Sequence, residues 1–554
     1  MRSSLPLMFL SVISFNIILR YPDVFYETGA DSFGNHLLSR AIIDNGFDAR
    51  FINILSFFGL FPGSNNMGGT FLLSAVSLIT SLSVANSIFV LPLYFFFLAC
   101  FSMFLLCRQF TRNTFICLLA ALLFTTSRKY IAFTDFTYSY RALYISMLPV
   151  LLFLAINLTK KFSKREIPWK LVILFILITV SMASIHRMIF MNGLVIFACI
   201  AYLLLNSFSI LEIYDKINIK LKIISTTLLV LSLYISSIYG LFFYSGSSEY
   251  TIEAGKRFFD SDFLPLTILN LGLSYAVQFG FILPLSAVGF FSLFKKFNKE
   301  YKLLLVIVAL YSLIWTDLTY GSFVYLPFIV ILVCLGFQFL FEIFKDYSFF
   351  GPQTYSYTFI LILILQTIPE FVVVNKSTYA GFPESSNYSR DVEYVKAYDS
   401  GLYLSSIGES DTVLISHLVS DTRISIYSGS PYYVESEMVN NSEFFTYEFT
   451  DISIFVTGKV NYIFEIEDDN LVRSFRYDVL FNDKKWDDSG NRINLNYIYK
   501  GEDQYILVLL RDISFVLGDN GQWYESPFIS SATNENYKFY DNGFHTLYNL
   551  AYNS

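Results

Sequence analysis

Long apolar stretches recur through the first two thirds of this sequence, and they restrict its fold more than any other feature. A helix needs roughly 20 apolar residues to cross the hydrocarbon core of a bilayer. Charged residues make up only 15% of the chain, whereas soluble domains contain roughly 25%. We therefore expect a polytopic α-helical membrane protein with about eleven transmembrane helices. The expected spans are Leu5–Leu19, Ala85–Cys107, Phe115–Ser127, Leu143–Leu158, Leu171–Ile185, Met188–Ser207, Ile223–Phe243, Leu264–Leu293, Leu303–Trp315, Phe323–Phe344 and Tyr355–Val374.

The distribution of basic residues decides whether one ambiguous stretch, Gly69–Ser83, also crosses the membrane. Cytoplasmic loops of membrane proteins carry an excess of Lys and Arg. If Gly69–Ser83 does not cross, most of the basic residues near the spans fall on one side, so we expect it to be interfacial or re-entrant. The N-terminus is then cytoplasmic, and the first loop, the 128–142 loop and the C-terminal tail are external. The basic residues on the cytoplasmic side are Arg2, Arg108, Arg112, Lys160, Lys161, Lys164, Arg165, Lys170, Lys216, Lys220, Lys222, Lys295, Lys296, Lys299, Lys302 and Lys345.

The charge of the chain is divided unevenly along its length. Residues 375–554 carry a net charge of −14, and residues 1–374 carry +7. This predicts a transmembrane domain over 1–374, with a first external loop over 20–84, and an extracytoplasmic soluble domain over 375–554. No basic, aromatic-laced patch indicates nucleic-acid binding. The tail should be α+β, with a helix over Asp391–Ile407 and strands near Thr412–Ser416, Arg423–Ser428, Asn461–Ile466, Tyr505–Leu510 and Ile513–Leu517.

The loop that follows the first span concentrates polar side chains beside the membrane. From Asp31 its pattern predicts an amphipathic helix that ends at Asn45-Gly46. One face carries Phe33, Leu37, Leu38, Ala41 and Ile42, and another carries Ser32, His36 and Arg40. Asp31 occupies the position of an N-cap, so its carboxylate either caps this helix or has a functional role.

Further ionisable residues fall on the same external face, where burial is costly and function is common. They are Asp135, Arg141, His186 and Arg187. Arginine binds phosphate through two parallel hydrogen bonds. A carboxylate can take a proton from an acceptor hydroxyl or bind a divalent cation that neutralises a leaving phosphate. A salt bridge of Asp135 with Arg141, and a structural hydrogen bond from His186, are the alternative interpretations.

The arrangement of a short first span, a polar external loop containing Gly29-Ala-Asp31-Ser-Phe-Gly-Asn-His36, and alternating spans resembles the GT-C superfamily of membrane glycosyltransferases. This superfamily includes protein mannosyltransferases and catalytic subunits of oligosaccharyltransferases. The resemblance implies that Asp31 is the key acidic residue of the first external loop. It also implies that Asp135 is the acidic residue of the second loop and that His186 is the histidine found at a span end in archaeal-type members.

Two departures from the superfamily pattern bear on the reaction. Oligosaccharyltransferase subunits carry Trp-Trp-Asp-Tyr-Gly, and the nearest match here is Trp486-Asp-Asp-Ser-Gly490, with Lys485 in place of the first Trp. Asp, Ser and Gly are ordinary turn residues, so this segment is predicted to be a turn. Thr137 stands where a second carboxylate would accompany Asp135, which weakens the case for a tightly bound metal.

The sequence therefore predicts an integral cell-membrane glycosyltransferase that uses a polyprenyl-phosphate-linked sugar on the external face. Asp31 is the expected catalytic residue, as a base or as a metal ligand. The expected ligands of the donor phosphate are Asp135, Arg141, His186, Arg187, His36 and Arg40. Asp31 and Asp135 would hold any divalent cation, Mg²⁺ or Mn²⁺, and the acceptor would be a glycan, a lipid or a protein. The alternatives are a non-catalytic transporter or assembly protein for lipid-linked glycans, and an oligosaccharyltransferase-type subunit.

Overall fold

The computed structural model describes most of the first 344 residues and isolated strands of the tail. The described residues are 5–21, 27, 30–45, 54–60, 66–134, 136–238, 283–296, 299–312, 321–344, 361, 398–399, 402–403, 406, 413–415, 432–433, 462–464, 497–499, 505–510, 515–517, 523–525, 538–541 and 545–549.

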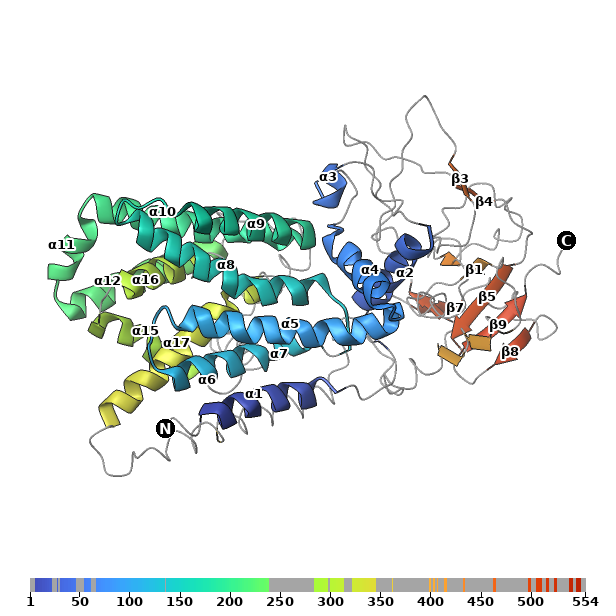
Figure 1. The fold of residues 1–554 in the computed structure, drawn as a ribbon, viewed down its shortest axis with the longest axis horizontal. Helices are drawn as coiled ribbons and strands as arrows, with labels where there is room; N and C mark the ends of the chain where they lie inside the picture. The colour runs from blue at the N-terminus through green and yellow to red at the C-terminus, as the bar shows by residue number, and fades with distance from the viewer. Residues whose placement is uncertain are drawn as a thin grey trace. The chain divides into compact units, whose positions relative to one another are not determined.

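Helices dominate the described part of the first 344 residues (Figure 1). Four helical segments are long and apolar enough to cross a membrane, namely Val84–Cys107, Tyr140–Phe162, Arg187–Ser207 and Phe323–Ile343. The full set is α1 (Leu5–Leu19), α2 (Ala30–Asn45), α3 (Ile54–Phe57), α4 (Gly68–Thr80), α5 (Val84–Cys107), α6 (Thr114–Thr125), α7 (Arg128–Ile131), α8 (Tyr140–Phe162), α9 (Trp169–Ile185), the 3₁₀ helix η1 (Arg187–Asn192), α10 (Gly193–Ser207), α11 (Ile210–Lys216), α12 (Ile219–Ile238), α15 (Pro284–Lys296), α16 (Lys299–Tyr311) and α17 (Gly321–Phe344).

These helices coincide with most of the spans expected from the apolar pattern. The first expected span, Leu5–Leu19, has the same bounds as α1. The ambiguous stretch Gly69–Ser83 contains α4, whose 13 residues extend about 20 Å at 1.5 Å each. That length is short of the roughly 30 Å hydrocarbon core, although its non-crossing placement stays a prediction. The expected span Tyr355–Val374 and most of Leu264–Leu293 lie outside the described residues.

The chain divides into two compact units. The first comprises Met1–Tyr21, Pro92–Asp135 and Tyr140–Thr378. The second comprises Pro22–Leu91, Phe136–Ser139 and Tyr379–Ser554. The first loop, a short piece of the second loop and the tail are thus grouped together.

Helices α15 and α17 make the closest crossing among the described helices of the first unit. A Cβ atom added to Gly289 would overlap the carbonyl oxygen of Leu332, and one added to Gly336 would overlap that of Leu285. Small residues at such crossings let helix backbones approach closely, and this packing helps to drive helix association within a bilayer. Glycine is therefore required at both positions by the spacing of the two helices.

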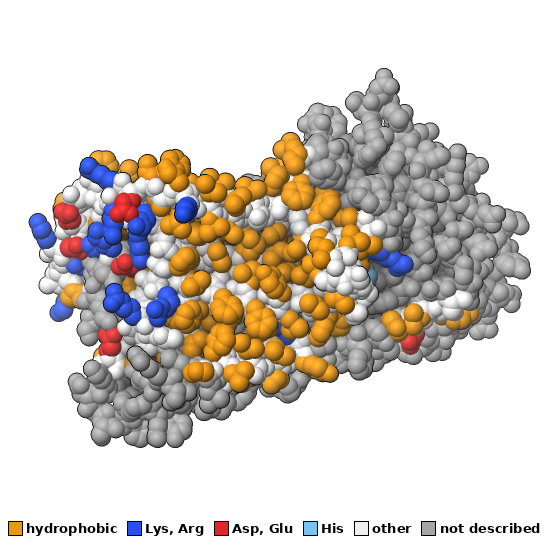
Figure 2. Space-filling model, in the orientation of Figure 1, with side chains coloured by type: hydrophobic (Ala, Val, Ile, Leu, Met, Phe, Trp, Pro, Cys, Tyr) orange, Lys and Arg blue, Asp and Glu red, His pale blue; other side chains and the backbone are white. Residues whose placement is uncertain are grey.

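Basic loops of the first unit are joined to one another by polar contacts. Lys160 Nζ lies 2.9 Å from Gln109 Oε1 and 3.1 Å from Glu300 Oε1, which links the end of α8 to the turn after α5 and to the start of α16. Asp215 accepts hydrogen bonds from Lys302 at its carboxylate (2.5 Å) and from Lys222 at its backbone carbonyl (2.8 Å). Figure 2 shows Lys and Arg side chains gathered at one end of a broad apolar surface. The expected clustering of basic loops on one side is thus present, while the side of the membrane that they face stays a prediction.

The tail contains short strands at several of the expected places. Strand β5 has the bounds expected for Tyr505–Leu510, whereas Arg423–Ser428 lies outside the described residues, as does most of Asp391–Ile407. A mixed five-stranded sheet has the order β2-β1-β5-β9-β8, in which β1 runs parallel to β2 and β5 and antiparallel pairs join β9 to β5 and β8. The strands are β1 (Val413–Ile415), β2 (Tyr432–Tyr433), β3 (Tyr462–Phe464), β4 (Tyr497–Tyr499), β5 (Tyr505–Leu510), β6 (Phe515–Leu517), β7 (Trp523–Glu525), β8 (Lys538–Asp541) and β9 (His545–Asn549).

The glycine crossing predicts an unusual response to alanine. Alanine ordinarily stabilises a helix interior by roughly 0.5–1 kcal/mol relative to glycine. Gly289→Ala should nevertheless lower the free energy of unfolding by about 1–3 kcal/mol, because the methyl group would push α15 away from α17. Thermal unfolding of the detergent-solubilised protein measures this. Gly193→Ala is the matched control, because no atom lies within 4 Å of a Cβ added there. Equal melting temperatures for the two variants would contradict the proposed packing.

The basic end of the first unit predicts its sidedness. Lys164 lies in the exposed turn between α8 and α9, and the described natural cysteines are buried or half-buried. Lys164→Cys should therefore react with a thiol reagent only after the membrane is permeabilised. Labelling of intact cells by an impermeant reagent would reverse the topology.

Candidate functional site

Helix α2 forms where the polar loop predicts it and ends at Asn45, the expected stop. It begins at Ala30, so Asp31 lies in its first turn, where the helix dipole favours a negative charge, and not at the expected cap position. The apolar face is buried as expected, with Phe33 1% exposed. The polar face is buried too, since Ser32 and Ser39 are 0% exposed. These polar groups therefore need partners within the protein.

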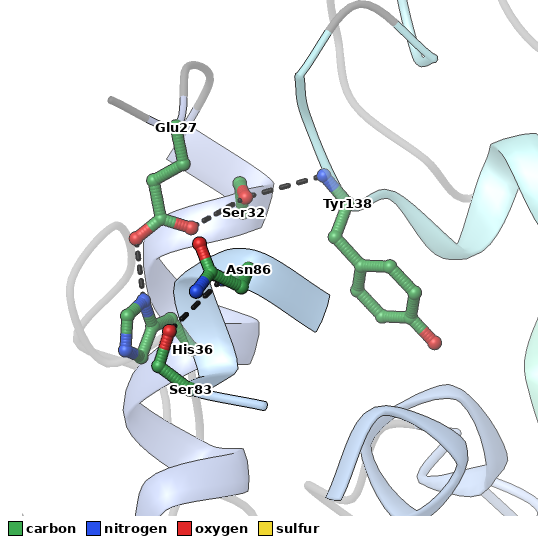
Figure 3. Close-up of polar contacts among 6 residues, drawn as sticks. All are labelled: Glu27, Ser32, His36, Ser83, Asn86 and Tyr138. Atoms are coloured by element: carbon green, nitrogen blue, oxygen red, sulfur yellow. Dashed lines mark hydrogen bonds and ion pairs between the residues drawn. The ribbon is translucent and has the colours of Figure 1, made fainter. Parts of the chain in front are cut away.

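A buried carboxylate supplies two of those partners. Glu27 lies just before α2, and its side chain is 0% exposed. Its Oε1 lies 2.6 Å from His36 Nδ1, and its Oε2 accepts a hydrogen bond of 2.9 Å from the Ser32 hydroxyl (Figure 3). The His36 side chain is 9% exposed. Both oxygens of Glu27 are thereby fixed by one face of α2.

The same face of α2 holds the chain of the second loop. The Tyr138 backbone N–H donates to Ser32 Oγ over 3.2 Å, and Asn35 Nδ2 donates to the Tyr138 carbonyl over 3.1 Å. The Tyr138 hydroxyl donates to the Gly69 carbonyl over 2.6 Å, which reaches α4. Ser32 follows Asp31 directly, and Tyr138 lies three residues after Asp135 in the chain. The segments next to the two nominated carboxylates are thus hydrogen-bonded, although Asp135 itself lies outside the described residues.

In the first unit, Arg20 fixes the chain that leads to Asp135. This side chain is 1% exposed and lies at the end of α1. Its Nε donates to Thr134 Oγ1 over 2.9 Å, and Nη2 donates to the Thr125 carbonyl over 2.8 Å. The guanidinium also lies within 5.4 Å of the centroids of the Phe96 and Tyr130 rings, a distance typical of cation–π contacts.

The other candidate residues are divided between the two units. Arg141, His186 and Arg187 belong to the first unit, as Arg20 does, and His36 and Arg40 belong to α2 in the second. Arg141 lies 5.2 Å from the Phe133 ring, and His186 follows α9 directly, with Arg187 next to it. His186 Nδ1 accepts the Met188 backbone N–H over 3.1 Å, so its neutral ring carries the proton on Nε2. Burial, reinforced by the charges of Arg141 and Arg187, lowers the pKa of His186 to about 3. His186 is therefore a neutral hydrogen-bond donor at pH 7.

Among the residues that the structure describes, no group of three or more His, Cys, Asp or Glu side chains could hold a metal ion. Glu27 and His36 approach one another, but both carboxylate oxygens of Glu27 already accept hydrogen bonds. The described residues therefore do not build a cation site. The assignment of Asp31 and Asp135 as ligands stays a prediction.

Sequence reasoning missed four residues of this arrangement: Glu27, Asn35, Tyr138 and Arg20. Glu27 and Arg20 stand out in hindsight as charges beside a long apolar span, where an ionisable residue is expensive. Asn35 and Tyr138 meet across 103 residues of sequence, and no local pattern indicates that contact.

Comparison with known proteins shows which solved structures have a similar fold. No protein-family model matches the chain, and no curated protein does. Among solved structures, it resembles the Archaeoglobus fulgidus oligosaccharyltransferase in the apo form, with 11% identity and a TM-score of 0.51 over 80% of this chain and 66% of the other. For the same enzyme tethered to an acceptor peptide with the NVT sequon, the identity is 12% and the TM-score is 0.49, over 80% of this chain and 65% of the other. For the archaeal oligosaccharyltransferase AglB from Archaeoglobus fulgidus, in complex with an inhibitory peptide and a dolichol-phosphate, the identity is 13% and the TM-score is 0.47. The match covers 77% of this chain and 64% of the other.

This chain spans about two thirds of the length of these proteins. At such low identity the likeness concerns the fold alone. The likeness bears out the resemblance seen in the sequence at the level of fold: the chain has a fold similar to that of the Archaeoglobus fulgidus oligosaccharyltransferase.

Proposed function

We propose that this chain is an integral membrane glycosyltransferase that transfers a sugar from a polyprenyl-phosphate-linked donor to an acceptor on the external face. The observation that carries the proposal is the hydrogen bonding between α2 and Tyr138. It joins the segments that neighbour Asp31 and Asp135, on a fold similar to that of an oligosaccharyltransferase.

The donor explains the mixture of charges that the sequence places beside the membrane. A polyprenyl chain lies in the bilayer, and its phosphate lies at the headgroup level. Arg40, Arg141 and Arg187 supply guanidinium groups, which bind phosphate oxygens in pairs. His186, whose neutral ring carries its proton on Nε2, adds an imidazole hydrogen bond.

Asp31 is the residue on which the transfer step depends in this proposal. Its carboxylate takes a proton from the acceptor or, with Asp135, holds a divalent cation such as Mg²⁺ or Mn²⁺. Such a cation, when bound, would neutralise the phosphate that leaves with the polyprenyl chain. The first turn of a helix suits either role, because the positive end of the helix dipole favours a negative charge there.

The external location follows from the basic loops. Because these loops share one end of the first unit, the positive-inside rule makes that end cytoplasmic. Alternation of the spans then puts the first loop, the second loop and the tail outside. The tail over residues 375–554 is proposed to fold there as an α+β domain.

An oligosaccharyltransferase-type activity is the second candidate, and the likeness of fold is compatible with it. The segment Trp486–Gly490 argues against it, because Lys485 and Ser489 stand where the motif in those enzymes has its first Trp and its Tyr. An acceptor panel separates the two, since an oligosaccharyltransferase would glycosylate an Asn-X-Thr peptide. A transporter is disfavoured, because Asp31, Arg141 and His186 lie at or next to helix ends, whereas transporters often place ionisable residues within broken membrane helices.

The role of Asp31 predicts a separation between stability and activity. Asp31→Asn should cost about 0.3–1 kcal/mol of stability, through the lost charge at the helix N-terminus. It should lower sugar transfer by roughly 10²–10⁴-fold, because an amide can neither take the proton nor bind a cation as a carboxylate does. Transfer from radiolabelled short-chain polyprenyl-phosphate sugars and thermal unfolding measure the two effects.

Asp31→Glu is the matched variant, because it keeps the charge and should keep part of the rate. If Asp31→Asn transfers sugar at the wild-type rate, Asp31 serves the helix only and the central assignment is wrong.

A further inference from the structure

The Glu27–His36 pair has the geometry of a carboxylate that orients an imidazole. The separation of 2.6 Å between Oε1 and Nδ1 is that of a short, charge-assisted hydrogen bond. We infer that His36 accepts the proton of the attacking hydroxyl group in the transfer reaction and that Glu27 positions it. This inference rests on the proposed function, and it assigns the acceptor to the class of hydroxyl compounds.

The first argument concerns the tautomer of His36. A carboxylate beside Nδ1 keeps the proton on that atom, which leaves the lone pair of a neutral ring on Nε2. Figure 3 shows Nε2 on the side of the ring away from Glu27. Nε2 makes no hydrogen bond to another described residue, and the side chain retains 9% exposure. His36 therefore has a nitrogen available to a substrate.

The second argument is that Glu27 is itself held in place. Its other oxygen accepts the Ser32 hydroxyl proton over 2.9 Å. Ser32 Oγ in turn accepts the backbone N–H of Tyr138 over 3.2 Å. A run of hydrogen bonds thus leads from the second loop through Ser32 and Glu27 to His36. Each member fixes the orientation of the next, as a general base requires.

The third argument is energetic. Taking a carboxylate out of water costs several kcal/mol, and replacing a buried ion pair with packed apolar residues is often neutral or stabilising. The free energy of folding alone therefore does not explain why Glu27 and His36 are buried together in this unit. A chemical role for the second ring nitrogen of His36 accounts for the pair.

In the reaction, the acceptor oxygen attacks the anomeric carbon of the donor sugar while its proton moves to Nε2. The new carbon–oxygen bond forms as the bond to the phosphate oxygen breaks, and the polyprenyl phosphate leaves with the electron pair. Glu27 balances the positive charge on His36 until the proton passes to solvent. Asp31, five residues earlier on α2, then acts through its charge, as a cation ligand or as an electrostatic partner of the reacting groups.

The experiment uses the full chain in lipid nanodiscs. The donors are short-chain polyprenyl-phosphate mannose, glucose and galactose, and the acceptors are methyl α-mannoside and water. His36→Ala should lower kcat by roughly 10²–10⁴-fold with little change in the KM for the donor. Added imidazole should restore part of the rate in proportion to its concentration. A purely structural histidine would show no such rescue.

Glu27→Gln should also lower kcat without imidazole rescue, because the amide favours the wrong tautomer of His36 while the ring stays in place. Ser83→Ala is the matched control. The Ser83 hydroxyl accepts an exposed hydrogen bond from the Asn86 backbone N–H over 3.2 Å and makes no hydrogen bond to Glu27, Ser32 or His36, so kcat should stay at the wild-type value.

His36→Asn keeps an N–H donor for the Glu27 carboxylate while removing Nε2. It replaces His36→Ala as the test variant if His36→Ala does not fold. The inference is overturned if His36→Asn retains the wild-type kcat, or if imidazole fails to rescue a folded His36→Ala. A wild-type protein that uses none of the three donors would instead remove the proposed function, and the inference with it. Transfer to an Asn-X-Thr peptide but to neither hydroxyl acceptor would refute the acceptor class alone.

Discussion

The bilayer offers no hydrogen-bond partner, so every polar group near it must find one within the protein. This constraint explains the most unusual side chains of the structure. Arg20 is 1% exposed, yet its guanidinium reaches a hydroxyl and two backbone carbonyls. Glu27 is equally buried and is satisfied by Ser32 and His36. In both places a charge that would be costly in isolation fixes a loop next to a nominated carboxylate.

The elements that depend on local pattern were largely predictable, and the contacts between them were not. Apolar length alone located α1, and helical periodicity located α2 with its end at Asn45. The same periodicity gave no sign that the polar face of α2 would be buried, because Tyr138 lies 106 residues away from Ser32. Glu27 was missed for a related reason: it precedes α2, and its contact with His36 joins residues nine positions apart in the chain. Asp135 lies outside the described residues, so its part in the site rests on sequence.

A fold similar to that of an oligosaccharyltransferase narrows the range of functions without choosing one, because function resides in the site that a fold carries. Here the residues that the structure brings together are not the group of candidate residues expected from the sequence. Two arginines and His186 occupy the first unit, and a hydrogen-bonded group of Glu27, Ser32 and His36 occupies the second. The low pKa of His186 and the carboxylate beside His36 also separate two histidines that looked alike in the sequence. One is a neutral donor, and the other is paired with a carboxylate.

The crossing of α15 and α17 has a consequence for how this protein can evolve. Gly289 and Gly336 each face the backbone of the opposite helix, with no side chain between. No amino acid is smaller than glycine, so a larger residue at one position cannot be offset by shrinking the other. A lineage that loses either glycine can recover only through changes elsewhere that let the two helices settle farther apart. The two glycines are therefore expected to be retained or lost together. Any substitution at this crossing changes the packing of α15 and α17 in one way only, by making it looser.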